Sequence, residues 1–115
     1  MPLTPKQTSD IESAMADFLL RRRPAENLRH QVDLAWRIEG QSVEIFTIRP
    51  FWRDQRKKIE SSIAKATYVR TVNRWKIFWK RADSKWQTYQ PHPEAVFFDE
   101  FLSVVDEDEN HCFWG

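Results

Sequence analysis

Residues 32–47 read VDLAWRIEGQSVEIFT, with apolar side chains at alternate positions on both sides of Gly40. This alternation predicts two strands, each with one apolar face. Gly40-Gln41 is expected to form a two-residue hairpin loop with glycine first, so that Glu39 faces Ser42. The register that follows pairs Ile38 with Val43, Trp36 with Ile45, and Arg37 with Glu44. The apolar pairs then share one face of the hairpin, and the ion pair lies on the other.

Three further strands are predicted after this hairpin. Residues 49–58, which begin with Arg49-Pro50-Phe51-Trp52 and continue as a run of charges, are expected to be a connection or an edge segment with an irregular start. Residues 59–71 are rich in β-branched side chains, and strands are also expected at 74–81 and 85–90. Turn-like residues separate the last three segments, at Val72-Asn73 and at Ala82-Asp83-Ser84. The sequence therefore predicts a five-stranded antiparallel meander.

Helices are predicted at both ends of the chain. Residues 5–22 carry apolar side chains at spacings of three and four, with Thr4 as a cap. Pro93 is placed to begin a second helix that ends near Val105. Two helices on one face of the sheet give an α+β fold in a single domain, residues 1–115, with the other sheet face open to water.

The charges are sorted into blocks, although the net charge is only +1. Residues 49–85 hold twelve basic and three acidic side chains. After Lys85 there is no Lys or Arg, and seven carboxylates follow. A block of one sign attracts partners of the opposite sign, so the basic block is a candidate binding surface.

Alternation over residues 74–81 places several cations and one phenylalanine opposite Trp75 and Ile77. Regularly spaced cations neutralise phosphates, and an exposed aromatic ring between them can stack on a base. The sequence predicts a surface for nucleic acid or another anionic partner, formed by Arg70, Arg74, Lys76, Phe78 and Lys80. Two alternatives remain open. The basic face is a solvated sheet exterior, or the acidic residues 106–109, from the same chain or a second subunit, neutralise it.

No catalytic signature stands out. Two glycines are too few for a Walker loop or a dinucleotide fingerprint. Asp83-Ser84-Lys85 resembles the acid-x-Lys element of metal-dependent nucleases, so a nuclease-like hydrolase is the alternative function. Candidate zinc ligands lack the paired spacing of a finger or ribbon; they are His30, His92, His111 and Cys112. The acidic residues near Cys112 disfavour its thiolate. No catalytic residue, metal site or cofactor is predicted.

Location and assembly follow from composition. A single cysteine, a start without a leader pattern and the lack of a long apolar stretch predict a cytoplasmic protein without membrane insertion. A homodimer is expected, because an open sheet has edges that need cover and the chain is rich in aromatic residues. A purely structural role in protein–protein contacts is a further alternative. Residues 111–115 are too apolar for a solvated end, so the tail is expected to pack on the domain.

The sequence from Ile63 to the C-terminus resembles the C-terminal half of the DUF3024 family, small bacterial proteins grouped as a domain of unknown function. Three stretches carry the resemblance: IAKATYV (63–69), WKIFWKRADSKWQTYQPHP (75–93) and EFLSVVDEDENHCFWG (100–115). It implies a stand-alone bacterial protein of this length and supplies no activity or site residue. Together these observations predict a non-enzymatic binding or assembly module.

Overall fold

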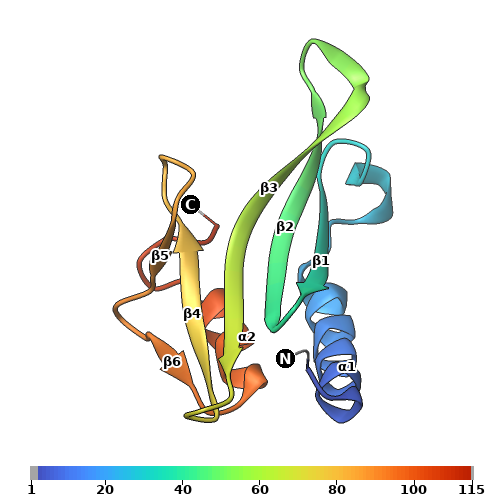
Figure 1. The fold of residues 1–115 in the computed structure, drawn as a ribbon. Helices are drawn as coiled ribbons and strands as arrows, with labels where there is room; N and C mark the ends of the chain where they lie inside the picture. Colours follow the sequence, from blue (N-terminus) through green and yellow to red (C-terminus); the bar gives the residue numbers. More distant parts are fainter. Residues whose placement is uncertain (1–2, 115) are drawn as a thin grey trace.

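The structure, a computed structural model, describes residues 3–114. It confirms the α+β fold, with an N-terminal helix, a five-stranded antiparallel meander and a C-terminal helix (Figure 1). The elements in chain order are α1 (Pro5–Arg22), a 3-10 turn η1 (Glu26–Leu28), β1 (Asp33–Glu39), β2 (Ser42–Phe51), β3 (Asp54–Val69), β4 (Arg74–Lys80), β5 (Trp86–Thr88), β6 (Glu94–Ala95) and α2 (Phe98–Glu107).

The strands β1 to β5 pair in sequence order, and the two-residue strand β6 adds to β4 beside β5. The predicted first hairpin is confirmed, since Trp36 pairs with Ile45 and Arg37 with Glu44. Gly40 has a φ of +59°, the left-handed region in which a residue without Cβ is unstrained. Gly40 in the two-residue loop thus sets the register of the first two strands.

Both helices lie on one face of the sheet, which we call the inner face (Figure 1). Alanines at the centre of this face let the helices approach closely, and Ala64 and Ala66 are fully buried. Around them the core holds large side chains from the two helices and from the strands β2 and β4: Ile11, Met15, Phe18, Val43, Ile45, Trp75, Ile77, Phe101 and Val105. Among residues 3–114, no helix covers the opposite sheet face, which we call the outer face.

The second helix begins later than the sequence predicted. Pro93 does not start it; Pro93 O instead accepts a hydrogen bond from Ile77 N (2.9 Å), and the next two residues form β6. The first helical residue is Phe98. The proline therefore continues the sheet, because its carbonyl is placed to extend the ladder of β4 before the chain turns into α2.

The C-terminal tail packs on the domain, as expected, as far as Trp114. Asp108, left-handed at φ 41°, accepts hydrogen bonds from the backbone N–H groups of Phe113 (3.0 Å) and Trp114 (2.9 Å). The Trp114 indole donates to Val105 O (2.8 Å), and Phe113 is buried against Tyr89. A carboxylate of the acidic stretch 106–109 thus holds the tail in place.

Ion pairs join the end of α1 to its neighbours. Arg21 and Arg22 both contact Asp106 of α2 at 2.8 Å. Arg23 donates two hydrogen bonds to Asp33 of β1, at 2.8 and 2.9 Å. The hydrogen bonds from Arg23 lower the pKa of Asp33 to about 2. These contacts connect α1 to α2 and to β1.

Residues 49–58, predicted to be a connection or an edge segment, are paired strands on either side of a short connection, and their outer edges are open. β2 continues to Phe51 and β3 begins at Asp54, so the two strands form one long hairpin. Pairing with β1 stops at Ile48, and pairing of β3 with β4 stops at Ala64. Residues 49–59, which we call the arm, therefore form a two-stranded ribbon that projects from the sheet (Figure 1).

Candidate anion-binding surfaces

Four of the five residues predicted from the sequence lie on the outer face of β4. Trp75 and Ile77 are buried on the inner face, and alternation places the other side chains of the strand outside. These are Arg74, Lys76, Phe78 and Lys80. Arg70 does not belong to this row; it is exposed in the turn between β3 and β4. The structure thus brings four of the candidates together on one strand.

The outer side chains of β4 interleave with side chains of its two neighbours. Lys65 of β3 has its ammonium nitrogen 5.0 Å from the ring centroid of Phe78 and 4.6 Å from that of Trp86 on β5. Lys80 lies 5.5 Å from the same Trp86 ring. Burial lowers the pKa of Lys65. Lysines therefore already lie over both rings, so these ring faces are less open to a nucleic-acid base than the sequence suggested.

Across β1 and β2 the outer face carries more carboxylates than cations. Arg37 contacts Glu60 (2.8 Å) and Glu44 (3.5 Å), and its guanidinium lies 4.4 Å from the ring centroid of Phe46. Ser62 donates a hydrogen bond to Glu44. Carboxylates outnumber cations around Arg37, so an anionic ligand finds a favourable surface only toward β4 and the arm.

The arm carries the densest positive charge of the described chain. Within its eleven residues there are five cations and one carboxylate; the cations are Arg49, Arg53, Arg56, Lys57 and Lys58. Among the ion pairs of residues 3–114, only the contact between Arg56 and Asp54 (3.1 Å) involves the arm. All five cations are exposed. The arm therefore presents charge that the fold does not use.

Aromatic side chains stand at the tip of the arm. Trp52 is 76% exposed, the most exposed tryptophan among the described residues. Arg53 lies 4.6 Å from its ring centroid, and the Phe51 ring lies at 6.0 Å. An indole this exposed makes no contribution to the core, so its surface is available to a ligand.

The turn between β4 and β5 lies at the same end of the sheet as the arm (Figure 1). It adds Arg81 and Lys85, both exposed. Asp83, the candidate nuclease carboxylate, accepts a hydrogen bond from the backbone N–H of Lys85 (3.1 Å). This is the contact of a turn residue, and it gives Asp83 a structural role.

The acidic residues 106–109 lie on the helix side of the sheet. Asp106 contacts the arginines of α1, and Asp108 binds the tail. Glu107 and Glu109 line a small hollow with Tyr89 and His92. Within one molecule, the acidic block therefore faces α1 and the tail and not the outer face of β4.

Metal and thiol candidates are dispersed. Among residues 3–114, no three His, Cys, Asp or Glu side chains lie close enough together to hold a metal ion. His92 instead pairs with Glu100 (2.8 Å). Burial, and then the charge of Asp108, raise the pKa of Cys112, which disfavours the thiolate.

Within residues 3–114, neither helix is long and apolar enough to span a bilayer.

Sequence reasoning identified the β4 row and missed the arm. The sequence did contain a signal for the arm: residues 49–59 have the highest local density of cations, next to the adjacent Phe51-Trp52 pair.

Comparison with family models gives one match, described as Domain of unknown function (DUF3024), over residues 3–115. The match covers essentially the whole chain, more than the half on which the resemblance rested. The comparisons with curated proteins and with solved structures found no significant match.

Proposed function

The chain belongs to the DUF3024 family, and from its surfaces we propose that it is a non-enzymatic module that binds nucleic acid through the arm. The proposal places the protein in the bacterial cytoplasm, where nucleic acid is accessible. The row on β4 is a secondary contact. The observation that carries the proposal is the arm itself, a projecting two-stranded ribbon with five exposed cations against one carboxylate.

The shape and charge of the arm match a phosphate backbone. A two-stranded β-ribbon is narrow enough to enter the major groove of B-DNA. Cations lie on both faces of the ribbon, since Arg49 pairs with Ile59 and the next residue, Pro50, pairs with Lys58. Phosphates on either wall of a groove would therefore meet a cation. Each neutralised phosphate releases counterions, which favours binding at low salt.

Protection of an open strand edge is the competing explanation for these cations. Lys and Pro on an exposed edge prevent pairing with another chain, and the arm has both. Edge protection, however, gives no reason for an exposed tryptophan at the tip, because an apolar ring promotes association. Trp52 with Arg53 over its ring suits a ligand that offers both a flat face and negative charge.

Fluorescence anisotropy with a labelled 20-base-pair duplex, and in parallel with the single strand, tests the proposal across a salt series. The variant Arg53→Gln/Lys57→Gln removes two arm cations. Affinity at low salt is expected to fall about tenfold, and the slope of log K against log salt to fall by about 2, since each lost phosphate contact removes about 0.9 from the slope on a duplex.

The control variant Lys6→Glu makes the same change in net charge at an exposed position in the first turn of α1. It is expected to retain nearly the full affinity and slope. Melting temperatures of all variants confirm that the fold is intact. Absence of binding to both oligonucleotides at low salt, or equal losses in the arm and control variants, would overturn the proposal.

A further inference from the structure

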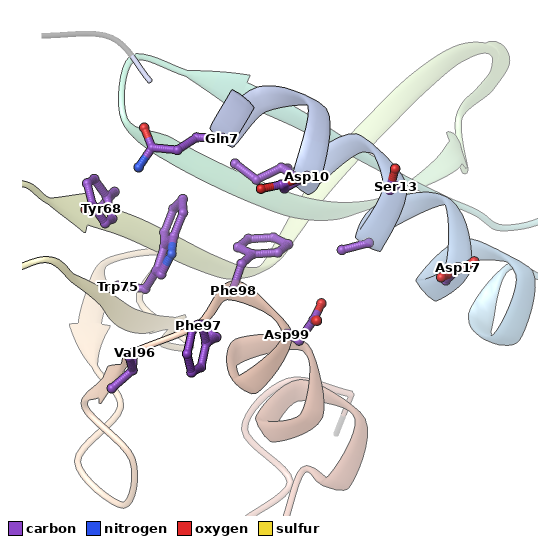
Figure 2. Close-up of a pocket in the computed structure, with 12 residues that line it drawn as sticks. Gln7, Asp10, Ser13, Asp17, Tyr68, Trp75, Val96, Phe97, Phe98 and Asp99 are labelled. Carbon is purple, nitrogen blue, oxygen red and sulfur yellow. The ribbon is translucent and has the colours of Figure 1, made fainter. Parts of the chain in front are cut away.

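The helix side of the molecule contains an open groove of about 520 Å³ between the start of α1 and the start of α2 (Figure 2). Its floor is aromatic. Trp75 contacts Tyr68 and Phe98, each with ring centroids 5.1 Å apart. At the rim Phe97 is 71% exposed and Val96 is 48% exposed. Such contiguous exposed apolar side chains are unusual on a small monomer and mark an interaction site.

The charges around this groove have one sign. Asp10 and Asp17 line it from α1, and Asp99 lines it from the first turn of α2. No Lys, Arg or His is among the described residues that line it. An aromatic floor with a carboxylate rim favours a ligand that combines an aromatic side chain with cations.

The arm has this composition, with Trp52 and Phe51 at its tip beside Arg53, Arg56 and Lys57. An arm cannot reach the groove of its own molecule. The strand β3 begins in the arm at Asp54 and ends at Val69, next to Tyr68, which lines the groove. The arm and the groove therefore lie at opposite ends of a strand of sixteen residues, in a molecule whose longest dimension is 45 Å.

We propose that the arm of one copy docks in the aromatic-floored, carboxylate-rimmed groove of a second copy, forming a homodimer in which both arms are exchanged. Two molecules lying side by side in opposite directions bring each arm to the other's groove. This arrangement closes with twofold symmetry, the commonest symmetry of soluble oligomers. Trp52 then packs on Phe97, and the arm cations face Asp10, Asp17 and Asp99.

This pairing goes beyond nucleic-acid binding but uses the same arm residues, so a second copy and a duplex compete for the arm. The pairing is therefore measured without oligonucleotide. Sedimentation at micromolar concentration is expected to show a dimer in low salt that dissociates as salt is raised. The single variants Trp52→Ala and Phe97→Ser each alter an exposed side chain, so the fold is retained, and each is expected to be monomeric. Leu20→Ser, at an 85% exposed position of α1 that does not line the groove, is the matched control and stays dimeric.

Mixing gives the decisive result. Trp52→Ala keeps an intact groove, and Phe97→Ser keeps an intact arm, so a mixture of the two monomeric variants is expected to form a heterodimer with one of the two contacts. A monomeric wild-type protein at 100 micromolar (roughly the upper end of the assay), a dimer insensitive to both substitutions, or a mixture that does not associate would overturn the inference. Because Phe97→Ser leaves every arm cation in place, its oligonucleotide binding reports on the proposed function separately.

Discussion

The packed body and the arm contain the same kinds of side chain but use them differently. In the body, Lys65 and Lys80 lie over the rings of Phe78 and Trp86, and the arginines at the end of α1 contact carboxylates. In the arm, Arg53 also lies over an indole, but that indole, Trp52, is 76% exposed, and all five arm cations are exposed. Basic and aromatic residues that the fold does not use are the ones available to a ligand, which is why the arm carries the proposed function.

The largest expected difference between the two regions is in stability. Phe113→Ala removes a buried ring from the body and is expected to lower the free energy of unfolding by about 3 to 5 kcal/mol. Deleting residues 112–115 removes Trp114 as well and costs more. Trp52→Ala, in the arm, is expected to change stability by less than about 0.5 kcal/mol. Urea unfolding of the three variants measures this, and a marginal effect of the deletion would show that the tail contributes little.

The second prediction concerns nucleic-acid affinity. Lys76→Gln/Lys80→Gln on β4 and Arg53→Gln/Lys57→Gln in the arm change the net charge equally. The arm variant is expected to lose about tenfold in affinity at low salt and the β4 variant about threefold, because Lys80 already lies over Trp86. Anisotropy titrations compare them. A larger loss in the β4 variant would move the binding site to the outer face of the sheet.

A smaller effect is expected from ion pairs of the body. Asp106→Ala leaves Arg21 and Arg22 of α1 without their common partner on α2. The pairs are partly exposed, so the expected loss is about 1 kcal/mol and declines in high salt. Arg56→Ala in the arm, whose contact with Asp54 is highly exposed, is the control and is expected to have no measurable effect. Thermal unfolding at two salt concentrations distinguishes the two variants.

The smallest expected effect is the acid dependence of the contact between Arg23 and Asp33. The pKa of Asp33 is about 2 in the folded protein and near 4 in the unfolded chain. Its stabilising contribution is therefore complete above the unfolded value and is lost as the pH falls through about 2. Asp33→Asn is expected to be slightly less stable than the wild type at pH 6, with a difference that shrinks below the unfolded pKa and disappears below the folded one. A difference in stability between the wild type and the variant that persists at low pH would show that another interaction causes it.

The sequence predicted those helices and strands that bury one face, because the buried face produces a periodic apolar pattern. Alternation around Gly40 specified the first hairpin because one face of each strand is buried, and the spacing of Ile11, Met15 and Phe18 specified α1 for the same reason. In the arm neither face is buried, so apolar and polar residues do not alternate there. The tip also lacks a glycine that would mark a hairpin turn. The predicted helix start at Pro93 was wrong because the fixed φ of proline suits the first turn of a helix and an extended strand equally well. Cation positions were predicted correctly on β4, but their partners on β3 and β5 depend on register.

The most direct test of the account is an NMR titration of the isotope-labelled protein with the duplex oligonucleotide at low salt. Backbone amide shifts are expected to change first and most strongly in residues 49–59, with smaller changes along β4 at 74–80. Unchanged arm resonances while the duplex binds elsewhere, or no change anywhere at saturating duplex, would contradict this expectation.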